Sequence, residues 1–469
     1  MLKKARILWI CNKKPAKVSI ILNHSVDSFG GWLDSTCETL MEMDMVELYI
    51  LFPDDIEYEG NWKTLSFFSF DEKNCRSRFL NVIGEIYPDV IHVWGTEFVH
   101  SNEALKACEQ LNLIERCVVS IQGLVSLCGR YHFTEGLPNK VVKSYTLHDF
   151  LKQDNIAKSR ERFIRRGIAE IEALRRTNHI IGRTDWDKAA SQMFNPHAKY
   201  HFCNESLRRC FYENTWEIDK IVRNSIFVSQ CSYAIKGFHY LLEAMPEILK
   251  RHSNAHIYIA GTDLLNLSIK QRLLISSYQR YLLKLIKKNR LQEHVTFLGN
   301  LCEKEMCRQY LRANVFVSSS TIENSSNSVG EAMLVGCPVV TSDVGGIKNM
   351  LEHGKEGFVY QSSAPYMLAY YVNEIFEDDK LAIKFSENGK IHAIKTHDRE
   401  VNMETLYGIY TEIMALHTTE NLGGGVNENY VIFQRFFKYI QVQFLVLLLV
   451  NLRISFDCIK IFTTSMYEG

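Results

Sequence analysis

The stretch STIENSSNSVGEAMLVGCPVVTSDVGG, residues 320–346, decides the fold. The apolar run NVFVSSS (314–320) leads into it, and CPVVTSD (337–343) has the same strand-like character. Between the two runs, NSVGEAMLVG has helical spacing. A strand, a helix and a strand in this order predict a βαβ unit with both strands parallel in one sheet. The polar loop TIENSSNS then lies beyond the carboxyl end of the first strand, where parallel sheets bind ligands.

The same alternation of strand-like and helix-like segments extends along the chain in both directions. It predicts an α/β protein of two doubly wound Rossmann-like domains, and 469 residues suit two domains of about 200 residues each. We expect an N-terminal domain over 1–218, a C-terminal domain over 219–418, and a glycine linker with an apolar and basic tail over 419–469. Strands are predicted at 5–12, 46–52, 88–95, 117–123, 180–182, 225–230, 255–261, 295–301, 314–320, 337–343 and 357–360.

Composition is that of an ordinary soluble globular protein. Lys plus Arg equals Asp plus Glu at 54 each, so the total charge gives no sign of nucleic-acid binding. The basic segment 141–195 reads as an amphipathic helix with a solvated face. The 13 cysteines are odd in number and lack paired metal-ligand spacing, which favours reduced thiols in a cytoplasmic protein. No apolar run reaches the roughly 18 residues of a membrane-spanning helix.

The loop between strand and helix suits an anionic ligand. Free amides at the helix start can face a phosphate, and Ser326, Asn327 and Ser328 are candidate caps. On either side, Glu323 and Glu331 can accept hydrogen bonds from sugar hydroxyls. A diphosphate flanked by two sugars, which is a nucleotide-sugar, would use all of these groups. The alternative is that the two glutamates are a surface acid and a helix N-terminal acid favoured by the dipole.

The Glu-x7-Glu spacing of Glu323 and Glu331, together with the segment GEAMLVGCPVVTSDVGGIKNMLEHGKEGFVY (330–360) that continues it, resembles retaining glycosyltransferases of the GT-B fold, in the large family-4 group. SQCSYAIKGFHYLLEAM (229–245) is similar to the first strand and helix of their C-terminal domain, and PDVIHVWG and CVVSIQG resemble strands of their acceptor domain. The resemblance covers about residues 5–415. It implies an active site in the cleft between two Rossmann-like domains, with no metal and no cofactor.

The resemblance also implies roles for individual residues. Lys236 would neutralise the donor diphosphate, Glu331 would bind the ribose, and Glu323 would contact the transferred sugar. Gly30 and Gly31 match a glycine-rich loop near the phosphates. Gly299 and Leu301 match backbone positions of the base pocket. The implied partners are a UDP-, GDP- or ADP-sugar and a glycan or lipid-linked acceptor.

Two positions depart from the family pattern. Gln230 stands where an Arg commonly contacts the diphosphate, so Arg183 or Arg208 would have to replace that charge. Gln122 stands where a His commonly lies near the acceptor, and Gln cannot transfer a proton. His132 and His148 could act in its place as catalytic residues. For Arg183, Asp185, Glu205 and Arg208, cleft-lining or hinge roles stand against structural ion pairs.

We therefore expect a retaining hexosyltransferase of cell-surface polysaccharide biosynthesis. The alternatives are a nucleotide-sugar epimerase of the same fold and a catalytically silent binder of nucleotide-sugars or glycans. The tail 431–463 mixes apolar and basic residues, so it could hold the enzyme peripherally at the cytoplasmic membrane face. It could instead pack on the N-terminal domain, or not be native-like coding sequence at all.

Overall fold

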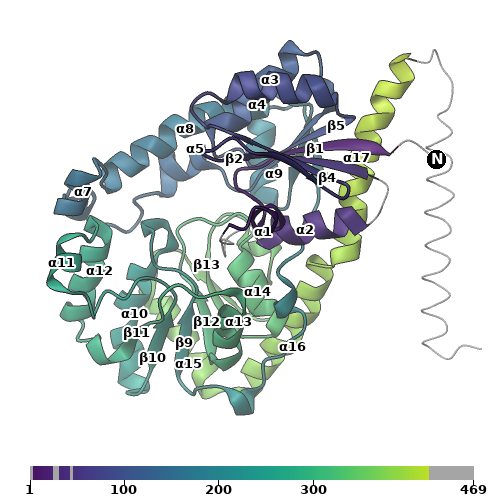
Figure 1. Ribbon diagram of the computed structural model, residues 1–469. Coiled ribbons are helices and arrows are strands. Elements are labelled where there is room, and N and C mark those ends of the chain that lie inside the picture. The colour runs from purple at the N-terminus through teal and green to yellow at the C-terminus, as the bar shows by residue number, and fades with distance from the viewer. Residues whose placement is uncertain (1–3, 25–30, 43–45, 422–469) are drawn as a thin grey trace, which may run out of the picture. The chain divides into compact units, whose positions relative to one another are not determined.

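The computed structural model describes residues 4–24, 31–42 and 46–421. The chain forms two compact units, Met1–Leu406 and Tyr407–Gly469, and the first unit contains both β-sheets (Figure 1). In the described part of the chain, no helix combines the length and the apolar character needed to cross a membrane. The predicted tail segment 431–463 lies outside the described residues.

The first sheet has eight strands in the order β3-β4-β2-β1-β5-β6-β7-β8, and only β3 runs antiparallel to its neighbour. Its strands are β1 (Ala5–Ile10), β2 (Val46–Pro53), β3 (Glu59–Trp62), β4 (Leu65–Phe70), β5 (Val90–Trp94), β6 (Cys117–Ser120), β7 (His179–Gly182) and β8 (Lys199–Phe202). The helices of this part are α1 (Ala16–Ile21), α2 (Gly31–Glu42), α3 (Cys75–Ile86), α4 (Val99–Gln110), α5 (Val125–Leu127), α6 (Asn139–Val142), α7 (Leu147–Leu151), α8 (Ile156–Arg176) and α9 (Asp185–Phe194).

The second sheet has six parallel strands in the order β11-β10-β9-β12-β13-β14. These are β9 (Ser225–Val228), β10 (His256–Ile259), β11 (Val295–Phe297), β12 (Val315–Ser318), β13 (Val339–Asp343) and β14 (Phe358–Gln361). Its helices are α10 (Phe238–Arg251), α11 (Ile269–Leu273), α12 (Ser277–Lys288), α13 (Glu303–Arg312), α14 (Asn327–Val335), α15 (Pro365–Glu377) and α16 (Asp379–Thr396), followed by α17 (Arg399–Asn421).

Burial explains why the central strands read as continuous apolar runs. Every residue of β5, β9 and β12 is buried, as expected where helices cover both faces of a parallel sheet. In the first sheet, the core under α3, α4 and α8 joins side chains such as Leu8, Phe79 and Ala173. The fold class predicted from the alternation of elements is confirmed.

Two parts of the first sheet differ from the prediction. No strand was predicted at β3 or β4, and β8 follows β7, which was predicted to be the last strand of this domain. β8 is an edge strand in which His201 alone is fully buried, so it lacks an apolar run. β3 has no buried residue at all.

Candidate active site

An ion pair joins the loops that follow two neighbouring strands of the second sheet. Lys236 ends a 3-10 turn after β9, and Glu323 lies in the loop after β12. The Lys236 Nζ donates to Glu323 Oε1 at 2.7 Å, and Ser320 Oγ donates to the same oxygen at 2.7 Å. Because β9 and β12 pair in parallel, their carboxyl ends meet at one edge, and the sheet itself brings the predicted lysine and glutamate together.

Glycines let these two loops approach closely. Gly237 has a φ of 64°, and a Cβ there would overlap the carbonyl oxygen of Ser319. Ser319 Oγ donates to the Gly237 carbonyl at 2.9 Å. Gly345 has a φ of 52°, and a Cβ at this position would overlap the carbonyl oxygen of Glu323. Only a residue without a Cβ fits either position, so both glycines help to fix the Lys236–Glu323 pair.

The start of α14 lies directly after this loop. Ser326 is its N-cap residue and is buried, but its side chain makes no capping hydrogen bond, and its amide lies 3.0 Å from the sulfur of Met350. Asn327 and Ser328 are the first two helical residues rather than caps. The prediction of Ser326 as a cap is therefore confirmed for its position, but the expected side-chain hydrogen bond is not formed, and Asn327 and Ser328 lie inside the helix. The helix start itself stays beside Glu323.

Arg208 and Glu331 form a buried bidentate ion pair. Arg208 Nε and Nη2 each donate to a Glu331 carboxylate oxygen at 2.8 Å. Burial raises the pKa of Glu331 to about 7, although the Arg208 guanidinium acts in the opposite direction. Arg208 lies in the link between β8 and β9, so the pair ties this link to α14. With its guanidinium engaged by Glu331, Arg208 is poorly placed to replace the arginine missing at Gln230.

Arg183 also has a carboxylate partner. It pairs with Glu205, and Gln122 Nε2 donates to Glu205 Oε1 at 2.5 Å. Arg183 Nη2 donates to the carbonyl of Ile121 at 3.3 Å. Burial is the main cause that raises the pKa of Glu205. The structure therefore brings together three residues predicted to line the cleft, as a hydrogen-bonded cluster at the carboxyl ends of β6 and β7.

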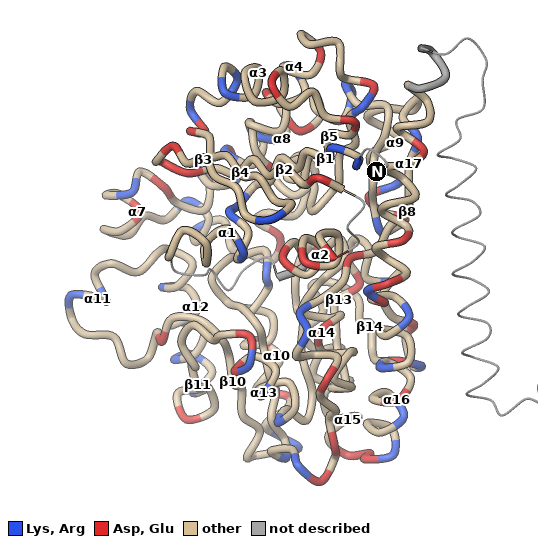
Figure 2. Tube along the Cα trace, turned by 45° about the vertical axis from the view of Figure 1, so that its right-hand side comes forward, with Lys and Arg blue, Asp and Glu red and all other residues tan. Residues whose placement is uncertain are grey.

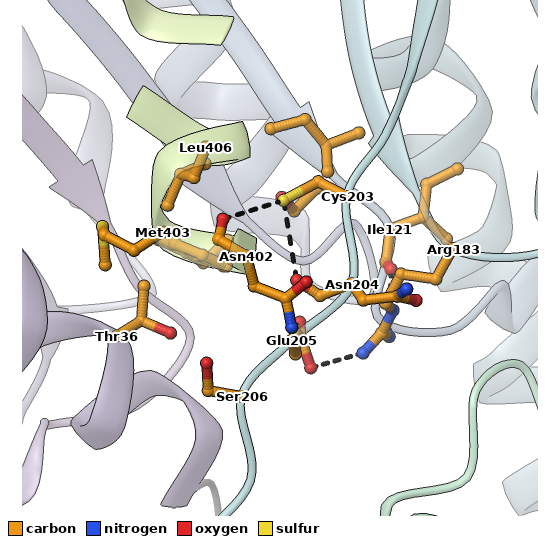
Figure 3. Close-up of a pocket in the computed structure, with 13 residues that line it drawn as sticks. Thr36, Ile121, Arg183, Cys203, Asn204, Glu205, Ser206, Asn402, Met403 and Leu406 are labelled. Atoms are coloured by element: carbon orange, nitrogen blue, oxygen red, sulfur yellow. Dashed lines mark hydrogen bonds and ion pairs between the residues drawn. The ribbon is translucent and has the colours of Figure 1, made fainter. Parts of the chain in front are cut away.

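Two residues of this cluster, Arg183 and Glu205, line a small pocket (Figure 3). Figure 3 shows the Arg183–Glu205 pair on one side and Thr36, from α2, with Met403, from the start of α17, on the other. Cys203 donates to the carbonyl of Asn402 across the same space. The cavity belongs to the N-terminal sheet and its link, because its other lining residues are Trp94, Ser120, Ile121, Ile181, Asn204, Ser206 and Leu406.

The remaining predicted residues are placed as follows. Asp185 is exposed at the first turn of α9, where it accepts from Asn349 Nδ2 at 2.9 Å. Gly299 has a φ of 74°, and its carbonyl accepts from the Gly261 amide at 2.9 Å. Leu301 packs against the hydrophobic core around the second sheet. Gln230 is partly buried just after β9. Gly30 lies outside the described residues, and Gly31 is the first residue of α2.

The two candidate histidines have different surroundings. The His132 carbonyl accepts from Thr321 Oγ1 at 3.0 Å, and its Nδ1 lies 3.3 Å from Glu135, so His132 adjoins the loop that carries Glu323. His148 lies on α7 with its Nδ1 3.4 Å from Asp149. Asp149 accepts in turn from the amide of Ser277 at the start of α12. His132 is therefore the better placed of the two.

Sequence reasoning missed Glu97, at the carboxyl end of β5. Its Oε2 is enclosed and has no hydrogen-bond partner among the described residues. Burial raises the pKa of Glu97 to about 7, and the neighbouring Glu170 adds to the shift. The Glu97 carboxylate lies against Gly95 and Gly123, which follow the adjacent strands β5 and β6. These two glycines at matching strand ends are the signal that could have pointed to it.

Glu170, unlike Glu97, is a buried carboxylate whose two oxygens both accept hydrogen bonds. It accepts from the amides of Val125 and Ser126 at 3.0 and 2.8 Å and from Thr96 Oγ1 at 3.0 Å. Glu170 thereby fixes the loop after β6, whereas Glu97 Oε2 has no hydrogen-bond partner among the described residues. An unpaired enclosed oxygen is costly, and such groups are common at functional sites.

Comparison with known proteins gives a family-model match over the second sheet. Residues 213–392 match the family model described as "Glycosyl transferases group 1". The chain is 32% identical over 153 residues to an uncharacterized glycosyltransferase of Methanocaldococcus jannaschii, covering 33% of this chain and 35% of that protein. It is 26% identical over 192 residues to spore coat protein SA of Bacillus subtilis, covering 39% of this chain and 48% of that protein. The chain thus spans between a third and a half of the length of these curated relatives.

Solved structures extend the likeness to both sheets. Sucrose-phosphate synthase from Thermosynechococcus elongatus superposes with a TM-score of 0.63 at 14% identity, covering 88% of this chain and 100% of that one. Anabaena HepE in complex with UDP superposes with a TM-score of 0.59 at 15% identity, covering 87% and 100%. At such identities the likeness shows the fold alone. The chain therefore has the GT-B fold, and its residues 213–392 match the glycosyl transferases of group 1.

Proposed function

We propose that this protein is a glycosyltransferase that moves a hexose from a nucleotide-sugar to a hydroxyl of a glycan or lipid-linked acceptor. The observation that carries the proposal is the Lys236–Glu323 pair, held beside the start of α14. A nucleoside diphosphate sugar offers a partner to each group: its phosphates attract the ammonium, and its sugar hydroxyls donate to the carboxylate. The two residues satisfy each other until such a ligand separates them.

A UDP-sugar is the donor that we propose first. HepE of Anabaena, which shares the fold, has been solved with UDP and with UDP-glucose. In this chain, Glu331 at the first turns of α14 would accept from the ribose. Burial raises the pKa of Glu331 to about 7, and the pairing with Arg208 acts in the opposite direction, toward the charged carboxylate.

Catalysis in this proposal is electrostatic. Lys236 and the amides at the start of α14 stabilise the charge that develops on the leaving phosphate. We propose that these groups suffice without a divalent metal, that the anomeric configuration is retained, and that the product is a cell-surface polysaccharide or its precursor. Activity unchanged by EDTA and an NMR assignment of the product anomer test the first two statements.

The decisive experiment incubates the protein with UDP-, GDP- and ADP-hexoses and a panel of alkyl glycosides, followed by mass spectrometry of the products. We expect one donor to give a glycoside one hexose larger. Lys236→Ala removes a charge-assisted contact of about 1.5–3 kcal/mol, so kcat/KM should fall roughly 10- to 150-fold. Full activity of Lys236→Ala would contradict the site. Conversion of the donor without acceptor would indicate an epimerase, and binding without conversion a silent binder.

A further inference from the structure

A cluster of exposed apolar side chains on α7 and α11 has no role in either core. Leu147, Phe150 and Leu151 on α7, and Ile269, Leu273 and Leu274 on or directly after α11, are each between 50% and 83% exposed. Tyr145, just before α7, is 46% exposed. Isolated exposed apolar residues are normal, but a contiguous group of this kind marks an interaction site.

The two helices form one continuous surface. The amide of Ser277, three residues after Leu274, donates to Asp149 Oδ2 on α7 at 3.0 Å. Arg280 Nη2 donates to the carbonyl of Tyr145 at 3.1 Å. α7 and α11 lie next to each other in both views (Figures 1 and 2). The seven apolar residues therefore make up a single α7–α11 surface, built from both sheet domains.

The charge around this surface has one sign. Segments 139–153 and 264–292, which the structure describes in full, contain a single acid, Asp149, and it is buried in the contacts just given. The exposed charged side chains that flank the apolar residues are Lys140, Lys143, Lys152, Lys270 and Arg272. Just outside these segments, Asp154 pairs with Arg162, Asp263 accepts from Asn266 Nδ2, and Glu293 follows the second segment.

Apolar side chains surrounded by basic ones match the chemistry of an anionic lipid surface. Aliphatic and aromatic groups enter the boundary of the acyl chains, and Lys and Arg stay at the lipid phosphates. A second copy of this surface is a poor partner because the basic residues would repel each other. A nucleic acid would use the charges but leave the aliphatic side chains in water.

We propose that the α7–α11 surface docks this protein peripherally on a bilayer that contains anionic lipids. Phe150, Leu151, Ile269 and Leu273 insert at the interface, and Lys152 and Lys270 contact phosphates. This inference does not rest on the proposed transferase activity. It also differs from anchoring by the C-terminal tail, because it assigns binding to residues of the folded part.

The test is sedimentation of the full chain with two kinds of vesicle, phosphatidylcholine alone and phosphatidylcholine with phosphatidylglycerol in equal parts. We expect binding to the anionic vesicles that weakens with added salt. Phe150→Ser with Leu151→Ser, and separately Ile269→Ser with Leu273→Ser, should each weaken partitioning about tenfold or more, since each removes apolar area that would be buried. The matched control is Ile391→Ser with Ile394→Ser, which removes exposed apolar residues of α16 instead.

The melting temperature of each variant, compared with that of the wild-type protein, checks that the fold survives. We expect it to survive because all the substituted side chains are exposed. The proposal is overturned if the full chain stays in the supernatant with anionic vesicles, which would favour an acidic protein partner. It is equally overturned if the α7 and α11 variants sediment like the α16 control, because binding would then lie elsewhere, as in the tail.

Discussion

At the scale of single residues, most carboxylates of the site have hydrogen-bond or ion-pair partners, and one carboxylate differs from them. Glu323 and Glu331 have cationic partners, and Glu170 has three donors, whereas Glu97 keeps an enclosed oxygen without one. The thiol of Cys128, in the segment after β6, interacts electrostatically with Glu170 and with both members of the Lys236–Glu323 pair. The loop after β6 that Glu170 fixes therefore lies within electrostatic reach of the Lys236–Glu323 pair.

Glu97 should make the stability of the protein depend on pH. Its pKa is raised to about 7 in the folded state, above the ordinary value of a glutamate, so its contribution is complete at acid pH and is lost as pH rises toward 7. Glu97→Gln removes this dependence. The free energy of unfolding of the variant, relative to wild type, should thus increase from about pH 5 to pH 7 and then level off. Urea unfolding at several pH values measures it, and parallel curves for the two proteins would show that Glu97 is not titrating there.

The same residues show what a sequence can reveal of a site. Glu323 was predictable because its loop follows a strand and precedes a helix, whereas Lys236 was predicted from the resemblance to GT-B glycosyltransferases. Glu97 was not, since its enclosure depends on the register that sets Gly95 and Gly123 beside each other. The partner of Arg208 could not be predicted either, because 123 residues separate it from Glu331.

At the scale of elements, the loops of the site depend on glycine conformation. Parallel strands that are buried on both faces have apolar runs, so β5, β9 and β12 were predicted. The mostly buried strand β4 was nevertheless missed, and the edge strands β3 and β8 have too few buried residues to be recognised. The glycine in the turn after β13 also carries structural information. Gly345 packs so closely against the Glu323 backbone that a Cβ would overlap its carbonyl oxygen. The paired glycines in the sequence reflect that contact.

Gly345→Ala should weaken donor binding through Glu323. Both Gly345 and Gly354 have positive φ, at 52° and 77°, so alanine at either costs about 1–2 kcal/mol in backbone strain. A Cβ at Gly345 also overlaps the Glu323 carbonyl, whereas a Cβ at Gly354 meets nothing within 4 Å. We expect Gly345→Ala to lower UDP-sugar affinity while Gly354→Ala, the matched control, lowers only stability. Calorimetric titration measures both, and equal affinities would mean that Glu323 does not need this turn.

At the scale of the whole molecule, a small polar contact joins the two sheet domains. Thr184 Oγ1, at the N-cap of α9, donates to Asn324 Oδ1 at 2.7 Å, and Asn324 Nδ2 donates to Asp187 Oδ2 at 2.9 Å. All three side chains are buried. Asn324 is the neighbour of Glu323, so this contact between the domains lies directly beside the proposed site. Such a contact could not be predicted from the sequence, because it requires the relative placement of two domains.

Asn324→Asp should turn this contact into a pH-dependent repulsion. The new carboxylate can still accept from Thr184 but cannot donate to Asp187, and two carboxylates this close cannot both ionise without cost. We expect the variant to lose about 1–3 kcal/mol of unfolding free energy at pH 8. Because the pKa of one carboxyl in the folded pair would be raised, the loss should diminish as pH falls and a proton is shared. Asn324→Ala, the matched control, loses the hydrogen bonds without adding charge, so its deficit should be similar at about pH 5 and pH 8. Urea unfolding of the three proteins at the two pH values decides the matter: a deficit of Asn324→Asp that does not change with pH would mean that Asp187 and residue 324 separate in solution, and that the domains are not held by this contact.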